Sequence, residues 1–442
     1  MQIKIRNFGP IKAFDFELEK NLIAIFGKNN IGKSYATTIV YLILKNLFNL
    51  EKIELNSFPM DSILVRLIEN FKRVFEEKGE INQEIAKIVG YLVQKPLVKD
   101  IQDSFYATFE DINSIISQFS QKETSIVIAT DMGDLILAIK EGKLVVKDFL
   151  LTASNEENGL INNFIKSFNE QSKTTDFDMS ANVMLSSMYN HFCLLNDKIS
   201  VYYLPSSRSG LYKALSSFSQ IFFELSKSRR FLSKKIEIPS LSEVVSDYLV
   251  GLSNAKIRKT NTNNPILSIV DEIEKNILKG DVIFDKDTQK IFYKPQQTDL
   301  VLDISLASSM VSELSPIVCY LKYLVAFSSE NALIFIEEPE AHLHPETQIL
   351  LMEIFAKLVK SNVKIVMTSH SNYMFNKMNN LILEGKIETA STQSIVLTET
   401  NEGSIAKSID VDELGIDDEN FIDATEELFN EKMALIDKLN DT

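Results

Sequence analysis

The stretch Gly27-Lys28-Asn29-Asn30-Ile31-Gly32-Lys33-Ser34 matches the pattern G-x-x-x-x-G-K-[ST] of a phosphate-binding loop. It follows the run Leu22-Ile23-Ala24-Ile25-Phe26, whose composition is typical of a central parallel strand covered by helices on both faces. Apolar residues recur with helical spacing after Tyr35. The first turn of a helix presents free N–H groups and its positive dipole end to an anion. The sequence therefore predicts a strand, loop and helix that bind ATP.

Individual residue types in this loop predict individual roles. Gly27 and Gly32 allow the backbone to close on phosphate groups. Lys33 is expected to bridge the β- and γ-phosphates, and the Ser34 hydroxyl to bind Mg²⁺. The full set of expected nucleotide contacts in the loop is Gly27, Asn29, Asn30, Gly32, Lys33, Ser34 and Tyr35.

Composition indicates an ordinary soluble globular protein. The 442 residues are 45% hydrophobic and 24% charged, which is enough core for one large or two modest domains. The first residues lack the apolar segment of a signal peptide, and we identify no apolar run near the ~20 residues that span a bilayer. We therefore expect a cytoplasmic protein without a membrane partner. Cys193 and Cys319 lie far apart in the sequence, which favours small core residues over a disulfide or a zinc site.

Charge bears on possible binding to nucleic acid. Lys plus Arg minus Asp plus Glu is 46 − 61 = −15, which disfavours non-specific adhesion of the whole molecule to DNA. Positive charge is nevertheless concentrated in one middle segment, at Lys227, Arg229, Arg230, Lys234, Lys235, Lys256, Arg258 and Lys259. A solvated helix face is the favoured interpretation, and a DNA contact is the alternative.

Periodicity along the chain predicts strands and helices, which we expect to form one composite α/β unit over residues 1–442. Alternating residues at 2–7 and 14–18 predict an antiparallel sheet beside the loop strand. Residues 46–120 and 152–200 are predicted to be helical insertions, with strands near 125–128, 135–139 and 144–149 between them and a further strand at 201–204. Residues 211–280 are predicted to be a helical segment that carries the basic runs, and residues 301–442 a last lobe.

A second motif predicts the other half of a nucleotide site. The run Leu333-Ile334-Phe335-Ile336-Glu337-Glu338 is an apolar strand that ends in two carboxylates, and it resembles a Walker B motif. Glu337 is expected to hold Mg²⁺ through water, and Glu338 to act as the general base on the attacking water. The alternative is that these acids only cap the next helix.

Three of the four histidines follow the predicted strands of this half. His370 comes after the strand 363–367, where an imidazole can sense or polarise the γ-phosphate, so we expect it to be catalytic. His342 and His344 do not share a helical face and lack further ligands, which argues against zinc. His191 is expected to be structural.

Together these motifs bring a family resemblance. The loop 27–34, the string Glu337-Glu338-Pro339-Glu340-Ala341-His342-Leu343-His344-Pro345 and Thr368-Ser369-His370 resemble the ABC-type ATPases of the overcoming-lysogenisation-defect (OLD) group, which is akin to chromosome-maintenance and recombination-repair ATPases. Residues 203–210 and the pattern around Gly415, Ile416 and Phe421 are also similar to members in bacterial defence. The resemblance implies an ABC-type P-loop NTPase head: two lobes, a mixed sheet plus antiparallel strands, and helical insertions.

The resemblance also implies that two heads enclose two ATP molecules, with each γ-phosphate meeting a signature serine of the opposite head. The matching segment contains Ser308 and Ser309, but Met310 stands where glycine is common, so close backbone approach to the phosphate is in doubt. An ordinary helix N-cap is the alternative role for these serines. Arg208 is expected to approach the nucleotide or the partner head.

Three hypotheses for function follow. Relatives with a Toprim nuclease carry it after the ATPase, but only 72 residues follow His370, which argues against the superficial match at Leu383-Glu384-Gly385 and Asp410-Val411-Asp412. The resemblance to stand-alone ATPases of the Septu and PARIS anti-phage systems implies a homodimer or larger ring that controls a separately encoded effector, such as a nuclease or toxin. A DNA-repair ATPase that acts through the basic segment is the second hypothesis, and a scaffold that ATP only stabilises is the third.

Overall fold

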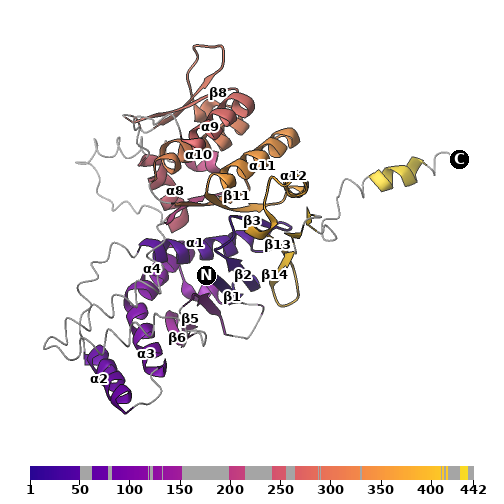
Figure 1. The fold of residues 1–442 in the computed structure, drawn as a ribbon. Helices are drawn as coiled ribbons and strands as arrows, with labels where there is room; N and C mark the ends of the chain where they lie inside the picture. Colours follow the sequence, from indigo (N-terminus) through magenta and orange to yellow (C-terminus); the bar gives the residue numbers. More distant parts are fainter. Residues whose placement is uncertain are drawn as a thin grey trace, which may run out of the picture.

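The computed structural model describes residues 1–49, 62–77, 82–117, 119, 123–131, 133–151, 199–214, 241–254, 264–286, 288, 290–328, 331–409, 411–412, 415–416 and 429–436. Its framework is one 11-stranded mixed sheet in the order β6-β5-β4-β1-β2-β14-β13-β3-β12-β11-β7 (Figure 1). These strands are β1 (Gln2–Phe8), β2 (Ile11–Glu17), β3 (Leu22–Phe26), β4 (Ser125–Ala129), β5 (Gly133–Lys140), β6 (Lys143–Leu151), β7 (Ile199–Leu204), β11 (Asn331–Glu337), β12 (Val363–Ser369), β13 (Thr392–Thr398) and β14 (Ser404–Ile409).

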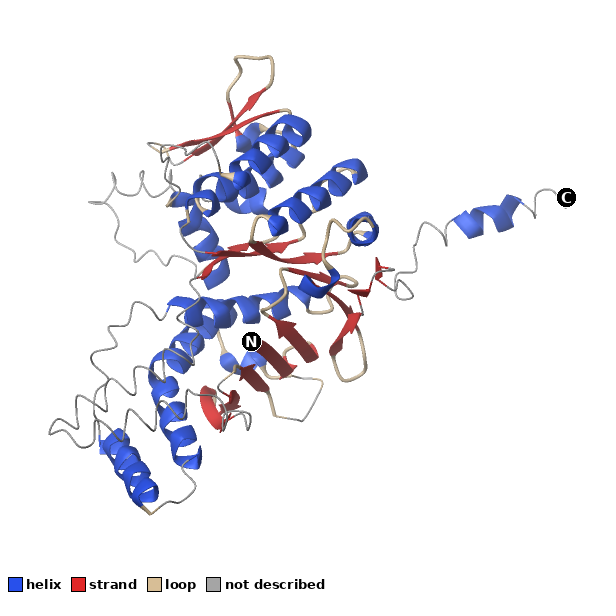
Figure 2. Ribbon diagram, in the orientation of Figure 1, coloured by secondary structure: helices blue, strands red, loops and turns tan. Residues whose placement is uncertain are grey.

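Helices cover both faces of this sheet (Figure 2). The α-helices include α1 (Lys33–Asn49), α2 (Ser62–Glu76), α3 (Asn82–Val93), α4 (Lys99–Phe109), α8 (Glu243–Ser253), α9 (Pro265–Glu272), α10 (Ser309–Tyr323), α11 (Pro345–Lys360) and α12 (Asn372–Leu383), and residues 208–214 and 429–436 are also helical. Shorter turns are η3 (Gln94–Val98), η4 (Ile112–Ile115), η7 (Ile273–Leu278), η8 (Ile304–Leu306), η9 (Val325–Phe327) and η10 (Thr389–Ser391). Two small sheets contain β8 (Gly280–Asp285), β9 (Lys290–Pro295) and β10 (Leu302–Asp303), and β15 (Val411–Asp412) and β16 (Gly415–Ile416).

Strand β3 is apolar throughout because it separates two hydrophobic cores. All five of its residues are buried. Ile23 and Ile25 face the core that α1 shares, whereas the alternate residues of β3 face the core formed by α10, α11 and α12. A strand that is covered on both faces has no polar side in its sequence. The continuous apolar run therefore marked a central strand.

The register of the parallel strands brings the predicted motifs to one edge of the sheet. Strands β7, β11, β12, β3 and β13 run parallel to one another. Glu337 pairs with Thr368, and Ser369 pairs with Phe26. The phosphate-binding loop, the acidic end of β11 and the end of β12 therefore leave the sheet side by side. This is the edge at which open α/β sheets bind ligands.

The predicted α/β class with a mixed sheet and added antiparallel strands is confirmed. The structure differs in one detail, because β1 and β2 do not lie next to β3. The hairpin of β13 and β14 lies between β2 and β3. Strand β14 pairs with β2 although they are almost 400 residues apart in sequence, at Ser404 and Ile11. Local periodicity predicts a strand but carries no information on such a distant partner.

The structure describes only part of the predicted insertions and none of the basic runs. Within 46–120 the structure describes α2, α3 and α4; α2 and α3 lie at one end of the molecule, whereas α4 contacts α1 (Figure 1). Of the segment 152–200, residues 152–198 lie outside the described residues and 199–200 begin β7. The described parts of 211–280 contain α8, α9 and η7. His191, Cys193, Phe421, Asp410 and the basic residues between 227 and 259 lie outside the described residues.

One apolar segment is longer than the sequence analysis suggested. Residues Ser309–Phe327 form a helical stretch of 19 residues that is long and apolar enough to cross a membrane, and 72% of its 18-residue window is buried inside the protein. The prediction that no run approaches this length is therefore wrong. Glu313 interrupts the apolar pattern but is itself fully buried, and Cys319 is buried as predicted. This burial is what a core helix of a folded domain shows.

Candidate nucleotide-binding site

The loop after β3 has a backbone that requires glycine at two positions. Gly27 has φ 145° and Gly32 has φ 94°, both in the region that favours glycine. A Cβ atom at Gly27 would lie 2.5 Å from Ile31 Cδ1 and 2.9 Å from the Leu397 carbonyl oxygen. Asn30 adopts φ 62°, which asparagine tolerates better than most residues. Asn29, Asn30 and Ser34 are exposed, so their polar groups are available to a ligand.

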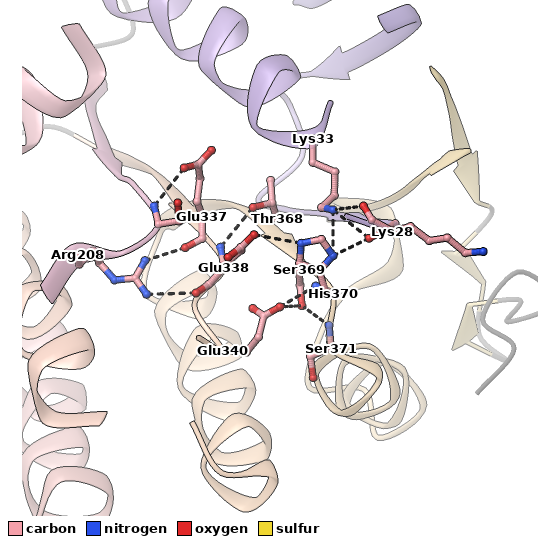
Figure 3. Close-up of polar contacts among 12 residues, drawn as sticks. Lys28, Lys33, Arg208, Glu337, Glu338, Glu340, Thr368, Ser369, His370 and Ser371 are labelled. Carbon is pink, nitrogen blue, oxygen red and sulfur yellow. Dashed lines mark hydrogen bonds and ion pairs between the residues drawn. The ribbon is translucent and has the colours of Figure 1, made fainter. Parts of the chain in front are cut away.

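Lys33 is buried, and its ammonium group is hydrogen-bonded to backbone carbonyls of its own loop. Its Nζ donates to the carbonyl oxygens of Gly27 at 2.9 Å and Lys28 at 2.7 Å, and lies 3.1 Å from His370 Nδ1 (Figure 3). Three acceptors therefore surround the three N–H bonds of the ammonium group. Burial lowers the pKa of Lys33 to about 8, although nearby carboxylates, Glu338 first among them, oppose this shift.

Glu337 ends β11, and its two carboxylate oxygens lie in different surroundings. Its Oε2 accepts a hydrogen bond from the Ser206 backbone N–H at 3.1 Å. Within the described part of the chain, Oε1 is buried and has no hydrogen-bond partner. A buried carboxylate oxygen without a partner is costly unless a ligand satisfies it. Oxygen donors from Glu337 and the exposed Ser34 hydroxyl are what Mg²⁺ prefers, so the residues present fit this metal.

Glu338 is turned away from the strand by an unusual backbone conformation. Its φ is 42°, in the left-handed region, which costs on the order of 1–3 kcal/mol for a residue other than glycine. Backbone hydrogen bonds hold it there: its N–H donates to the Thr368 carbonyl at 3.0 Å, and its carbonyl accepts from Arg208 at 3.2 Å. The side chain then reaches His370, whose Nε2 lies 3.1 Å from Glu338 Oε1. This contact lowers the pKa of Glu338, so the carboxylate is ionised at neutral pH.

His370 joins the two halves of the site. Glu340 Oε1 accepts hydrogen bonds from the His370 backbone N–H and the Ser369 hydroxyl, each at 2.7 Å. The ring Nδ1 lies 2.9 Å from the Gly27 carbonyl and 3.1 Å from Lys33 Nζ. Because an ionised carboxylate can only accept, the ring Nε2 carries a proton and donates it to Glu338, whereas Nδ1 lies between a donor, Lys33 Nζ, and an acceptor, the Gly27 carbonyl oxygen. His370 thus connects Lys33 to Glu338 (Figure 3).

Arg208 does not approach the nucleotide or a partner head, and that prediction is wrong. The side chain is fully buried, and its N–H groups donate to the carbonyls of Pro205 at 3.0 Å, Glu337 at 2.7 Å and Glu338 at 3.2 Å. Its charge pairs with buried Glu313 of α10, with Nε and Oε2 3.5 Å apart. The guanidinium group therefore fixes the backbone that carries both acidic residues. The sequence signal for this ion pair was Glu313, a single acidic residue inside the apolar run that forms α10.

The remaining predicted residues lie near the loop or at helix starts. Tyr35 packs on Phe109 of α4, with ring centroids 5.3 Å apart. Ser308 is the N-cap of α10 and accepts from the Val311 N–H at 3.5 Å, so the capping role left open by the sequence is present in the structure. Ser308 and Ser309 are both exposed, and their contact with an opposite head stays a prediction.

His342 and His344 lie on the segment between β11 and α11. His344 caps α11 by accepting from the backbone N–H of Glu346 at 3.4 Å, and His342 adopts φ 61° in the preceding turn. Among the residues that the structure describes, no group of three His, Cys, Asp or Glu side chains is arranged to hold a metal ion. The visible role of His344 is therefore that of a helix cap.

Comparison with known proteins gives the family. Residues 1–375 match the AAA ATPase domain family. The chain belongs to this family. The match spans the phosphate-binding loop, both acids of β11 and His370, so an AAA ATPase domain contains the whole site described above.

Solved structures that are similar to this AAA ATPase domain are heads of SMC proteins. An Smc head bound to the C-winged helix domain of ScpA has a TM-score of 0.42 and 11% identity, covering 93% of this chain and 97% of that chain. An Smc head with an extended coiled coil, bound to the C-terminal domain of ScpA derived from Pyrococcus furiosus, has a TM-score of 0.39 and 11% identity, covering 99% and 98%. The SMC head domain from Thermotoga maritima has a TM-score of 0.37 and 10% identity, covering 93% and 98%. No curated protein matches the chain in sequence.

Replacement of Arg208 tests its role as a buried anchor. We expect Arg208→Met to lower the free energy of unfolding by about 3–5 kcal/mol, because it leaves Glu313 buried without its partner charge. The double variant Arg208→Met/Glu313→Gln should recover part of this loss, since no uncompensated charge remains. Urea unfolding of the wild type, both single variants and the double variant measures the coupling. Strictly additive losses would contradict the pairing.

The lowered pKa of Lys33 predicts a pH dependence of nucleotide binding. Free Lys33 loses its proton above about pH 8, whereas phosphate binding requires the charged form. Affinity for ATP should therefore be constant below pH 8 and fall by up to about tenfold per pH unit above it. Titration with a fluorescent ATP analogue between about pH 7 and 9.5 measures this.

The matched control for this titration is Lys33→Arg. Arginine stays protonated across the whole range, so any affinity that this variant retains should not change with pH. A wild-type affinity that is equally constant up to the highest pH would show that Lys33 keeps an ordinary pKa in the free protein.

Proposed function

We propose that this chain is the ATP-binding and hydrolysing subunit of a bacterial anti-phage defence complex. In this proposal, ATP-dependent association of two heads, in a homodimer or a larger ring, controls a separately encoded effector such as a nuclease or toxin. The observation that carries the ATPase part is the convergence of Lys33, His370 and Glu338 through contacts of 3.1 Å each. The phosphate-binding loop and the general base thus meet at one point of the sheet edge.

The residues present account for binding and hydrolysis. The loop N–H groups and Lys33 would hold the phosphates, while Ser34 and Glu337 would hold Mg²⁺. When bound, Mg²⁺ neutralises negative charge on the β- and γ-phosphate oxygens. Ionised Glu338 is placed to take a proton from water as the water oxygen bonds to the γ-phosphorus and the bond to the β-phosphate oxygen breaks, giving ADP and phosphate. His370 holds the Glu338 carboxylate in position.

Exposure of the catalytic groups supports association of two heads. The side chains of Glu338 and His370 are 39% and 28% exposed, so the site of one head is open on one side. Hydrolysis benefits when bulk solvent is excluded from such a site and only the attacking water remains. A second head would close the site in this way. The exposed hydroxyls of Ser308 and Ser309 at the start of α10 are the groups that we expect from that second head. Two heads would associate when ATP binds, because ATP would bind the associated state more tightly than the separate heads.

The defence role rests on the sequence. The string of residues 337–345 resembles the OLD group, and the segment 203–210 resembles its members in bacterial defence, whose stand-alone ATPases act with a separate effector. We propose that the protein works in the cytoplasm, where phage DNA and an effector nuclease would both be present. The effector itself would bind elements outside the nucleotide site.

Two substitutions test the ATPase assignment. Glu338→Gln keeps the side-chain shape but cannot accept a proton, so turnover should fall by about 10²- to 10⁴-fold while ATP binding is retained. Lys33→Ala should lose ATP binding itself. It removes the buried cation, next to His370, that we expect to hold the phosphates. Phosphate release and equilibrium binding are measured for both.

A matched control is Glu346→Gln, because Glu346 is a highly exposed acid in the first turn of α11. Its turnover should equal that of the wild type. If Glu338→Gln hydrolyses ATP at the wild-type rate, Glu338 is not the general base.

The main alternative is a DNA-repair ATPase that binds DNA through the basic residues between 227 and 259. Purification of the Glu338→Gln protein from its native host with ATP and Mg²⁺ separates the alternatives. A stoichiometric nuclease or toxin in the complex supports the regulatory function. DNA alone, bound in a salt-dependent manner that charge reversal at Arg229 and Arg230 abolishes, supports repair instead. Normal assembly and protection by a hydrolysis-dead variant would favour a scaffold.

A further inference from the structure

Glu340 lies two residues after Glu338, in the segment that joins β11 to α11. The residue between them is Pro339, which is buried and whose ring restricts the backbone torsion φ. The Ala341 N–H donates to the Glu338 carbonyl at 3.1 Å, and the Leu343 N–H donates to the Glu340 carbonyl at 3.0 Å. A short hydrogen-bonded turn therefore holds the two acidic residues in a fixed relation.

The carboxylate of Glu340 is directed to the end of β12. Its Oε1 accepts hydrogen bonds from the His370 backbone N–H and from the Ser369 hydroxyl, each at 2.7 Å (Figure 3). Ser369 is fully buried, and its hydroxyl oxygen accepts in turn from the Ser371 N–H at 3.0 Å. Hydrogen bonds to a carboxylate are stronger than those between neutral groups. One oxygen of Glu340 thus fixes the chain at the point where it leaves the sheet.

The same short turn therefore holds His370 at two points. Glu340 binds its backbone N–H, and Glu338 Oε1 lies 3.1 Å from its ring Nε2. The other ring nitrogen, Nδ1, lies 3.1 Å from Lys33 Nζ. Because side-chain torsions occupy discrete staggered wells, the backbone position of a histidine limits where its ring can reach. A displacement of the His370 backbone would move the ring away from both partners.

We propose that Glu340 is a positioning residue for ATP hydrolysis, which holds the backbone of His370 so that the imidazole ring meets the Glu338 carboxylate. This inference rests on the proposed function. Glu340 touches neither the nucleotide nor the attacking water in this proposal, and it acts only through His370. A small misplacement of a catalytic group lowers the rate of the chemical step, even where the substrate still binds.

The test compares two substitutions of Glu340. Glu340→Ala removes the acceptor, so kcat should fall by about 10- to 100-fold. The affinity for a fluorescent, non-hydrolysable ATP analogue should stay close to the wild-type value. Glu340→Gln keeps an oxygen that can accept both hydrogen bonds but removes the charge, so it should retain most of the turnover. Phosphate release, equilibrium binding and the midpoint of thermal unfolding are measured for both variants.

A double variant shows whether the effect passes through His370. In the background of His370→Ala, the further change Glu340→Ala should cause no additional fall in kcat, since the residue that it positions is already absent. Ser369→Ala removes one of the two hydrogen bonds to Glu340 Oε1. It should lower kcat in the same direction, and it tests the contact if Glu340→Ala does not fold.

Glu353→Ala is the matched control. Glu353 of α11 pairs with Lys377 of α12, with Oε1 and Nζ 2.6 Å apart. This carboxylate joins the helices that follow β11 and β12, just as Glu340 joins the two strand ends, but its ion-pair partner is Lys377 rather than His370. Its kcat should equal that of the wild type.

The outcomes are distinct. If the wild type does not hydrolyse ATP, the proposed function itself fails. If the wild type hydrolyses ATP and Glu340→Ala keeps its kcat, the positioning role fails alone. Equal losses in Glu340→Gln and Glu340→Ala would assign the effect to charge. A further loss in the His370→Ala background, or an equal loss in Glu353→Ala, would assign it to general damage of the fold. Each of these results overturns the inference.

Discussion

The parallel pairing of β11, β12 and β3 is the constraint on which the rest of the site depends. Hydrogen bonds between these strands fix Glu337 opposite Thr368 and Ser369 opposite Phe26. A shift of one residue in either register would turn Glu337 to the other face of the sheet, because side chains alternate along a strand. Every contact among Lys33, His370 and the two acids follows from this register. The apolar residues that fill both cores are what make one register far more favourable than another.

The buried pair of Arg208 and Glu313 shows how the fold holds this edge in place. A buried ion pair contributes little net stability, because desolvation of both charges offsets their attraction. Its value here is geometric. Arg208 donates to three carbonyls at the ends of β7 and β11, and these lie immediately beside the acidic residues. Glu313 belongs to α10, whose first turn carries the exposed Ser308 and Ser309. The segment expected to meet a second head is therefore joined by one helix to the anchor of the acidic strand end.

The parts that sequence predicted well have a local physical signature. The loop 27–34 needs glycines and a lysine at fixed spacing, and β3 and β11 need continuous apolar runs, so each was visible in a short window. The insertion of β13 and β14 between β2 and β3 had no such signature, because strand partners distant in sequence leave no periodic pattern. Arg208 was misassigned for a related reason. An arginine after a strand looks the same in sequence whether it faces a phosphate or backbone carbonyls, and only its full burial distinguishes the two.

Two neighbouring glutamates acquire different tasks because the chain changes direction between them. Glu337 still has strand geometry, so its side chain points to the face that α1 covers, where its Oε2 accepts from the Ser206 N–H. Glu338 has φ 42°, and this left-handed turn directs its side chain to His370 instead. Two consecutive residues of a regular strand would point to opposite faces, and Glu338 would then enter the core of α10 to α12. The strained residue is thus the feature that allows one strand end to carry one buried and one partly exposed carboxylate, which suits the different roles proposed for Glu337 and Glu338. The bonds from Thr368 and Arg208 to its backbone explain why the strain persists.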